Sequence, residues 1–290
     1  MKNITQLFIT FAFSASVFAQ TAALPESQFF AICMDTHDTK KRSIEEQSVM
    51  LKELGFVGMK HLNLGRIQER VESSKKHGLK LIMVYLTIDV SKNPPFDAKL
   101  AESLACLKDS GTMLALNING GKPSDVSLDD KAVSVIRDIL KITEPLGVKV
   151  ILYPHLNSLV EKVDDAVRLA KRFPNNEVGV MFNLCHWAAY DKSENLETAL
   201  RSTLPYLAAV SINGTDTPEE IQAKKGNWIQ PLDAGSYDVS QVLKVLDKIN
   251  YTGPVGLQCF GIRGDSRVHL ERSMKKWKEM RERNVSTTPL

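Results

Sequence analysis

The sequence predicts a single (β/α)8 barrel, and three observations support this fold class. Apolar runs of strand length alternate with amphipathic helices along the chain, and eight such runs fit the ~250 residues typical of this barrel. The runs are apolar throughout, as in parallel strands that are buried on both faces. No glycine-rich G-x-G-x-x-G follows the first run, where Cys33-Met34-Asp35-Thr36-His37 stands instead. A doubly wound sheet is therefore the weaker alternative.

The strands and helices are expected in strict alternation. The apolar runs place the strands at 29–34, 56–62, 79–86, 112–118, 148–152, 178–182, 208–212 and 255–260. One helix is expected between the fifth and sixth strands, and the others at 43–54, 66–77, 97–108, 128–144, 194–203, 239–249 and 266–283.

Local signals set the ends of these elements. Ser43 and Glu46, three residues apart, form a capping box ahead of the first helix, and Gly55 ends that helix. Gly78 ends the second helix in the same way. Residues 133, 136, 139 and 140 give the fourth helix an apolar stripe at helical spacing, which indicates the face that packs on the barrel.

The composition indicates a globular chain with one core. Hydrophobic residues make up 43% of the sequence and charged residues 24%. Lys and Arg number 37 against 34 for Asp and Glu, and this near balance gives no reason to expect nucleic acid or an anionic membrane as a partner. The four cysteines form no C-x-x-C pair. Buried free thiols are the preferred interpretation, and a Cys33–Cys259 disulfide is the alternative.

The N-terminus has the features of a signal peptide. Lys2 precedes an apolar stretch at 7–18 that is too short to span a membrane, and a small-x-small cleavage site ends at Ala19. The mature protein is therefore expected to be exported, periplasmic or secreted, with no further membrane span. The expected organisation is a signal peptide at 1–19, a single barrel domain at 25–284 and a polar tail at 285–290.

Polar and aromatic side chains are concentrated where the predicted strands end. The carboxyl ends of the strands meet at the ligand-binding face of such a barrel, and four of the six histidines fall there: His37, His61, His155 and His186. His155 and His186 are the candidate acid–base residues, because imidazole titrates near neutral pH. The candidate substrate-binding residues are Asp35, Lys60, His61, Tyr85, Asn117, Tyr153, Asn183, Asn213, Gln258 and Arg263. These hydrogen-bonding groups suit a small carbohydrate, together with aromatic faces at Tyr85, Tyr153, Trp187 and Trp228.

Four segments carry a resemblance to a known family. They are NINGG after the fourth strand, ILYPH at the fifth, GVMFNLCHW at the sixth and YTGPVGLQCFG at the eighth. Nearly the whole mature chain resembles the xylose isomerase-like TIM barrels, which include sugar phosphate isomerases and epimerases. The resemblance implies a divalent metal held by Glu, Asp, His and Glu at strands five to eight. Such a site moves a proton next to a carbonyl group.

The chain departs from this pattern at all four metal-ligand positions, which carry Tyr153, Asn183, Ser211 and Gln258. Amide oxygens are poor anchors for a hard divalent cation, and amides do not act as general bases. We therefore expect the family's metal site to be absent and assign no cofactor. A displaced metal site built from His61, His155 and His186 stays open as an alternative.

Two functions fit these residues. The first is an exported isomerase, epimerase or lyase that acts on a free sugar, a glycoside or an oxidised glycoside, with His155 and His186 moving protons. The alternative is a non-catalytic barrel that binds sugar through its amide and aromatic groups. A glycoside hydrolase with paired carboxylates is disfavoured, because the fourth and eighth strands end in Asn117 and Gln258.

Overall fold

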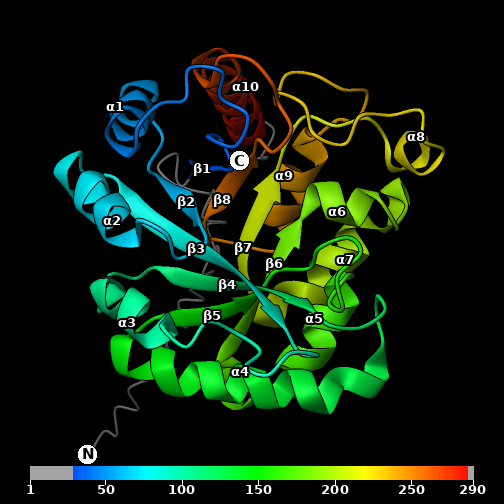
Figure 1. Cartoon of the computed structure of the whole chain (residues 1–290). Coiled ribbons are helices and arrows are strands. Elements are labelled where there is room, and N and C mark those ends of the chain that lie inside the picture. Colours follow the sequence, from blue (N-terminus) through cyan, green and yellow to red (C-terminus); the bar gives the residue numbers. More distant parts are fainter. Residues whose placement is uncertain (1–28, 287–290) are drawn as a thin grey trace, which may run out of the picture.

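Eight parallel strands close into a barrel in the computed structural model, which describes residues 29–286 (Figure 1). Each strand pairs with its neighbours in the chain, and β8 pairs with β1, so the predicted fold class is confirmed. The strands are β1 (Phe29–Ile32), β2 (Gly58–Leu62), β3 (Lys80–Asp89), β4 (Met113–Asn119), β5 (Lys149–Leu152), β6 (Val178–Asn183), β7 (Leu207–Ile212) and β8 (Val255–Gln258).

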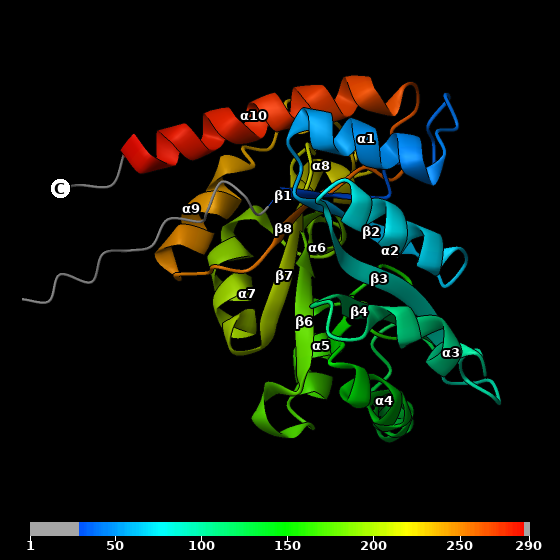
Figure 2. The ribbon, with the colours of Figure 1, turned by 90° about the vertical axis from the view of Figure 1, so that its left-hand side faces the viewer.

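Helices cover the outside of the barrel. They are α1 (Ile44–Leu54), α2 (Ile67–Lys76), α3 (Leu100–Leu104), α4 (Asp129–Thr143), α5 (Val163–Ala170), α6 (Leu184–Ala188), α7 (Leu196–Thr203), α8 (Pro218–Gln222), α9 (Ser240–Lys248) and α10 (Ser266–Ser286). Figure 2 shows α10 lying beside α1 and α9, and it contacts both. The last helix therefore packs between the helix that follows β1 and the helix that precedes β8.

Some element bounds differ from the prediction for physical reasons. β3 extends to Asp89 because it pairs with β4 as far as Asn119, whereas β8 already ends at Gln258. The helix predicted at 97–108 is the short α3, followed by a 3-10 turn.

Two of the helices, α6 and α8, were not predicted from the sequence. The first follows Asn183 directly and resembles a strand end in the sequence. The second carries a usable signal, because Thr217 and Glu220 form a capping box and Pro218 occupies its first turn.

The predicted signal peptide, residues 1–19, lies outside the described residues, as do residues 287–290 of the predicted tail. Residues 285–286 belong to α10, which runs beyond its predicted end. Within residues 29–286, no helix is both long and apolar enough to cross a membrane.

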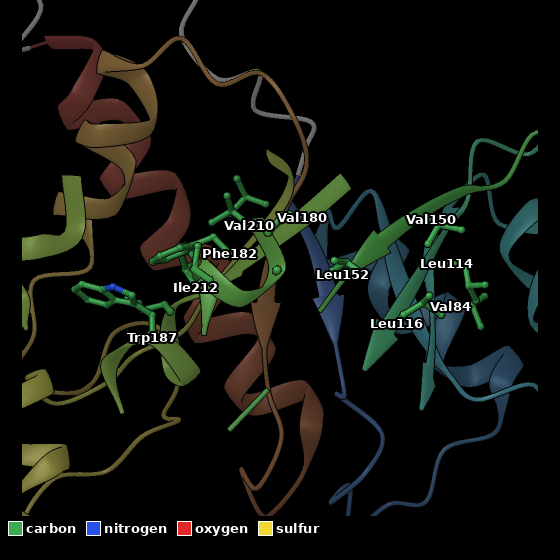
Figure 3. Packing of buried hydrophobic residues seen from close by; sticks show 14 of the residues in the cluster. Val84, Leu114, Leu116, Val150, Leu152, Val180, Phe182, Trp187, Val210 and Ile212 are labelled. Atoms are coloured by element: carbon green, nitrogen blue, oxygen red, sulfur yellow. The ribbon is translucent and has the colours of Figure 1, made fainter. Parts of the chain in front are cut away.

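Two apolar layers hold the barrel together. Alternate strand residues fill its interior, among them Phe30, Ile32, Met83, Ile151 and Met181. The residues between them point outward and pack under the helices. Figure 3 shows part of this outer layer, formed by Val180, Phe182, Val210, Ile212 and Trp187.

Trp187 belongs to the outer layer and not to the ligand-binding face. It is fully buried, its ring centroid lies 5.9 Å from that of Phe182, and its Nε1 donates a hydrogen bond to Asp191 at 3.0 Å. The expectation that Trp187 presents an aromatic face to a ligand is therefore wrong. The reason is α6, which starts directly after β6 and places this side chain in the outer layer.

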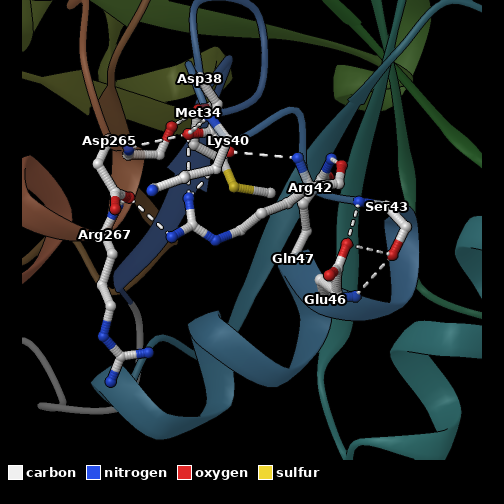
Figure 4. A network of polar contacts seen from close by, with 10 residues as sticks. Met34, Asp38, Lys40, Arg42, Ser43, Glu46, Gln47, Asp265 and Arg267 are labelled. Atoms are coloured by element: carbon white, nitrogen blue, oxygen red, sulfur yellow. Dashed lines mark hydrogen bonds and ion pairs between the residues drawn. The ribbon is translucent and has the colours of Figure 1, made fainter.

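A polar network fastens the loop after β1 to the start of α10 (Figure 4). Asp38 accepts hydrogen bonds from Nη1 of Arg42 at 3.0 Å and from the backbone N–H of Ser266 at 3.1 Å. Nη2 of Arg42 pairs with Asp265 at 2.7 Å. These contacts fix the rim loop that follows Cys33.

The capping box predicted for α1 is present, and it gives a testable stability difference. The backbone N–H of Glu46 donates to Oγ of Ser43 at 3.2 Å, and the backbone N–H of Ser43 donates to the Glu46 carboxylate at 2.7 Å. We expect Ser43→Ala to lower the unfolding free energy by about 1 kcal/mol, measured by urea denaturation. Ser43→Asp keeps a capping oxygen and should remain close to the wild type. Equal losses in both variants would contradict the capping role.

All four cysteines are free thiols, so the Cys33–Cys259 disulfide is not formed. Burial raises the pKa of Cys185 to about 12 and that of Cys259 well above its usual value. Both side chains are therefore unreactive thiols that pack in the barrel.

Candidate functional site

A cavity of about 230 Å³ opens at the carboxyl ends of the strands. Six of its lining residues are predicted site residues: Lys60, Tyr85, Tyr153, His155, His186 and Gln258. The others are Cys33, Leu62, Ile229 and Phe260. The cavity is smaller than the ~300–1,000 Å³ typical of sites for drug-sized ligands, which favours a ligand with a single ring.

Two larger grooves lie elsewhere on the molecule. One, of about 800 Å³, runs between the loop after β7 and α10, and the other, of about 480 Å³, lies at the opposite end of the strands beside Trp277. Neither is lined by a histidine or by a predicted site residue. The smaller cavity is therefore the candidate site, because it has the chemical groups and the position that this fold uses for ligands.

His155 and His186 lie against each other at the edge of the cavity. Their ring centroids are 4.2 Å apart and the rings are inclined by 44°. Nδ1 of His155 is 2.9 Å from the carbonyl oxygen of Leu156, which can only accept, so Nδ1 carries the proton. Nε2 of His155 is then the nitrogen with the free lone pair. Nδ1 of His186 accepts a hydrogen bond from the backbone N–H of Leu156 at 3.4 Å.

Both imidazoles are neutral at neutral pH. Burial, reinforced by the neighbouring His155 and Lys60, lowers the pKa of His186 to about 3. Burial also lowers the pKa of His155, which Lys60 reinforces. A neutral His155 is ready to accept a proton, whereas His186 is too hard to protonate to act as an acid at neutral pH.

Two tyrosines and a lysine form the opposite part of the cavity. The rings of Tyr85 and Tyr153 meet edge to face with their centroids 5.0 Å apart, and Nζ of Lys60 lies 4.4 Å and 5.4 Å from those centroids. Burial raises the pKa of both tyrosines, so their hydroxyls stay protonated. Nε2 of Gln258 donates to the Tyr153 hydroxyl at 3.1 Å, which leaves the hydroxyl's own proton free to donate.

Six predicted site residues do not line the cavity, and three of them lie at its rim or outside the barrel. Asp35 and Arg263 are exposed in the loops after β1 and β8. His61 follows Lys60 in β2, so it points away from the barrel interior, and its Nε2 is 2.7 Å from the carbonyl oxygen of Gly65. Burial lowers the pKa of His61 as well.

The other three are asparagines, and all are buried: Asn117, Asn183 and Asn213. Nδ2 of Asn183 donates to the carbonyl of Pro154 at 3.0 Å. Nδ2 of Asn213 donates to the carbonyl of Trp228 at 2.7 Å. Asn213 therefore holds the long loop after β7, whose Ile229 closes one side of the cavity.

The four positions of the family's metal ligands form two hydrogen-bonded pairs. Gln258 donates to Tyr153, and Oγ of Ser211 donates to Oδ1 of Asn183 at 2.8 Å. Oε1 of Gln258 accepts the backbone N–H groups of the next two residues, each at 3.1 Å. The amide oxygens are thus engaged and the Lys60 ammonium lies nearby, so this donor set does not fit a hard divalent cation.

The three histidines of the displaced metal site, His61, His155 and His186, are not brought together. Among residues 29–286, no group of three or more His, Cys, Asp or Glu side chains is placed to hold a metal ion. His61 is separated from His155 and His186 because it faces the other side of the sheet.

The four apolar or thiol residues of the cavity were not predicted, because only side chains with a polar group were considered as site residues. Cys33, Leu62 and Phe260 all stand within two residues of a strand end, so a search without regard to polarity would have included them. Cys33 lies in a left-handed backbone conformation with φ of 52°. No signal in the sequence predicts this conformation for a cysteine. Ile229 belongs to the long loop and carries no local signal.

The family model described as xylose isomerase-like TIM barrel matches residues 50–280. The chain belongs to the xylose isomerase-like TIM barrel family. The resemblance drawn from the strand-end segments is thus confirmed. A comparison with curated proteins finds no match.

Solved structures share the fold at low sequence identity. The probable 3-DHS dehydratase AsbF of Bacillus anthracis has a TM-score of 0.68 and 16% identity, covering 87% of this chain and 98% of its own. The 3-keto-D-glucoside 4-epimerase YcjR of E. coli has a TM-score of 0.66 and 16% identity over 87% and 98%. D-psicose 3-epimerase of Clostridium cellulolyticum H10 has a TM-score of 0.65 and 15% identity over 88% and 98%.

Proposed function

We propose that this family member is an exported enzyme that isomerises, epimerises or eliminates from a single-ring sugar or sugar derivative, without the family's divalent metal. The observation that carries the proposal is one cavity that combines a neutral His155, two protonated tyrosines and the Lys60 ammonium. The names of three proteins with this fold, two epimerases and a probable dehydratase, are consistent with such chemistry.

In this proposal His155 removes the proton. Nε2 takes the proton from the carbon next to a carbonyl group, and the C–H electron pair moves into the enolate. The Tyr153 hydroxyl donates a hydrogen bond to the carbonyl oxygen, where the negative charge grows. Lys60 holds a second oxygen of the ligand. Return of the proton to the same carbon on the other face gives an epimer. Return to the former carbonyl carbon gives an isomer once the neighbouring hydroxyl has passed its proton to the former carbonyl oxygen. Elimination results when a β-oxygen substituent leaves with the proton that His155 holds.

His186 positions His155 in this scheme. It packs on the His155 ring and stays neutral, so it adds no charge that would oppose protonation of its neighbour. Asn183 and Asn213 donate to the carbonyls of Pro154 and Trp228, which adjoin cavity residues, and Gln258 lines the cavity itself. Asn117, Asp35, His61 and Arg263 are not among the lining residues.

Deuterium exchange tests the reaction. We expect the mature protein, incubated in D2O with keto-sugars, glycosides and oxidised glycosides, to place deuterium at a carbon next to the carbonyl group of its substrate. Exchange should continue in a chelator and should not rise on addition of Mn²⁺, Co²⁺ or Zn²⁺. Absence of exchange across the panel would exclude these substrates, and exchange that requires a metal would contradict the metal-free mechanism.

A non-catalytic sugar-binding barrel is the second candidate, and one observation favours it. No carboxylate lines the cavity, so the paired acids of the related enzymes have no counterpart among its lining residues. Calorimetric binding of a sugar without deuterium exchange or turnover would select this function.

Export is the part of the proposal that depends on residues 1–19. It favours a free sugar, a glycoside or an oxidised glycoside over a phosphosugar as the ligand. N-terminal sequencing of the protein recovered from outside the cytoplasm should begin at Gln20, and recovery of the uncleaved chain in the cytoplasm would contradict export.

A further inference from the structure

Lys60 is a buried cation with no anionic partner among residues 29–286. Its side chain belongs to a residue that is only 7% exposed, on the inner face of β2. Within residues 29–286, neither an ion pair nor a hydrogen bond joins its ammonium to another side chain or to the backbone. Its close neighbours are the faces of Tyr85 and Tyr153. Ring faces attract a cation but replace only part of the hydration that burial removes.

Two other buried cations of the described chain donate hydrogen bonds to oxygen acceptors within the protein. Arg70 and Arg281 are as deeply buried as Lys60. Arg70 donates to the amide oxygen of Gln47, and Arg281 donates to the carboxylate of Asp247 at 3.3 Å. Each therefore has an oxygen acceptor within the protein, whereas the Lys60 ammonium faces a cavity.

The rest of the cavity supplies no negative charge. Its other lining residues are apolar, aromatic, amide, thiol or imidazole side chains, and none is an aspartate or a glutamate. We therefore expect the balancing charge to enter with the ligand, because a buried unpaired charge is costly and an anionic partner offsets part of that cost.

We propose that the ligand of this cavity carries a carboxylate that pairs with the Lys60 ammonium. Resting on the proposed function, this makes the substrate a single-ring sugar acid, with its carboxylate at Lys60 and the carbon that loses its proton at His155. A monoanion matches the single cation. A phosphate dianion would leave one negative charge unbalanced, since no second cation lines the cavity.

Calorimetric titration with matched ligands tests the pairing. The probes are D-glucuronate and D-galacturonate, their neutral counterparts D-glucose and D-galactose, glucose 6-phosphate, and cyclohexanecarboxylate as a carboxylate without sugar hydroxyls. They are titrated into the mature protein, into Lys60→Met and into Lys149→Met. Lys149 is an exposed lysine at the opposite end of β5, so its variant controls for the loss of one positive charge.

We expect a sugar acid to bind the wild type and Lys149→Met at least tenfold more tightly than its neutral counterpart and than glucose 6-phosphate. Lys60→Met should lose that preference and bind the acid and the neutral sugar within about twofold of each other. Without ligand, Lys60→Met should unfold at a higher temperature than the wild type, because it removes an unpaired buried charge. This readout also shows that the variant is folded.

Three results would overturn the carboxylate pairing. They are equal binding of acidic and neutral sugars by the wild type, an unchanged preference in Lys60→Met, and a keto-sugar adduct on Lys60 trapped by borohydride, which would make Lys60 an imine-forming nucleophile. The first two leave the proposed sugar chemistry standing. Binding of cyclohexanecarboxylate that depends on Lys60, with no binding or turnover of any sugar, would instead overturn the proposed function and leave the carboxylate site in place.

Discussion

Replacing His155 by alanine is expected to lower kcat/KM by about 10²- to 10⁴-fold, the usual contribution of a positioned general base. The reason is the fixed orientation of this ring. Its Nδ1 donates to the carbonyl of Leu156 at 2.9 Å, so Nε2 is the lone-pair nitrogen of the cavity. Ligand affinity should change far less than turnover, because the base acts on the C–H bond and Lys60 and the tyrosines hold the ligand.

The pH profile gives a second readout of the same residue. Burial lowers the pKa of His155, so the base stays unprotonated at and below neutral pH. Activity should therefore fall only on the acidic side of the ordinary histidine pKa of ~6.5. The matched control is His61→Gln, a strand-end histidine outside the cavity whose replacement keeps a donor for the carbonyl of Gly65. Wild-type rates in His155→Ala, or an equal loss in His61→Gln, would refute the assignment.

His186 is expected to make the fold sensitive to acid. Burial lowers its pKa to about 3 in the folded chain, against ~6.5 when unfolded. The folded state thus resists protonation. Its stabilisation is complete above about pH 6.5 and is lost as the pH falls toward 3, by on the order of 5 kcal/mol at most.

The substitution His186→Gln tests this linkage. Glutamine offers an oxygen that can accept the backbone N–H of Leu156 and has no proton to gain. We expect urea unfolding at pH 7 to differ little from the wild type, so that measurement serves as the control. At pH 4 the variant should be the more stable of the two. An identical decline of both proteins in acid would show that other groups, such as the buried His269 with its pKa of about 4, dominate.

The alternation of short apolar runs with capped helices was enough to predict the barrel. An apolar run of strand length can be buried on both faces only inside a parallel sheet covered by helices, and eight of them close on themselves. The strand ends were predicted less well. Asp89 lies beyond the predicted end of β3 because pairing with β4 carries the strand further than its apolar run.

Six of the predicted site residues line the candidate cavity, and strand alternation explains most of that division. Period-two alternation places Lys60, Tyr85, Tyr153 and Gln258 inside the barrel. Tyr85 and Tyr153 share a face with the interior residues Met83 and Ile151, whereas Lys60 and Gln258 alternate with glycines. His61 follows Lys60 directly in β2, so its side chain points to the outer face of the sheet. Trp187 and Ile229 could not be placed by alternation at all, because a helix turn and a long loop set their directions.

The barrel, the family and the replacement of the four family ligand positions could all be predicted from the sequence. These features depend on residue type and on local periodicity along the chain. Which polar groups meet depends on the tertiary structure, in which His61 is separated from His155 and Gln258 donates to Tyr153. The lack of an anion beside the Lys60 ammonium among residues 29–286 is visible only there, because the charge balance of a buried group depends on residues that are distant in the chain and adjacent in space.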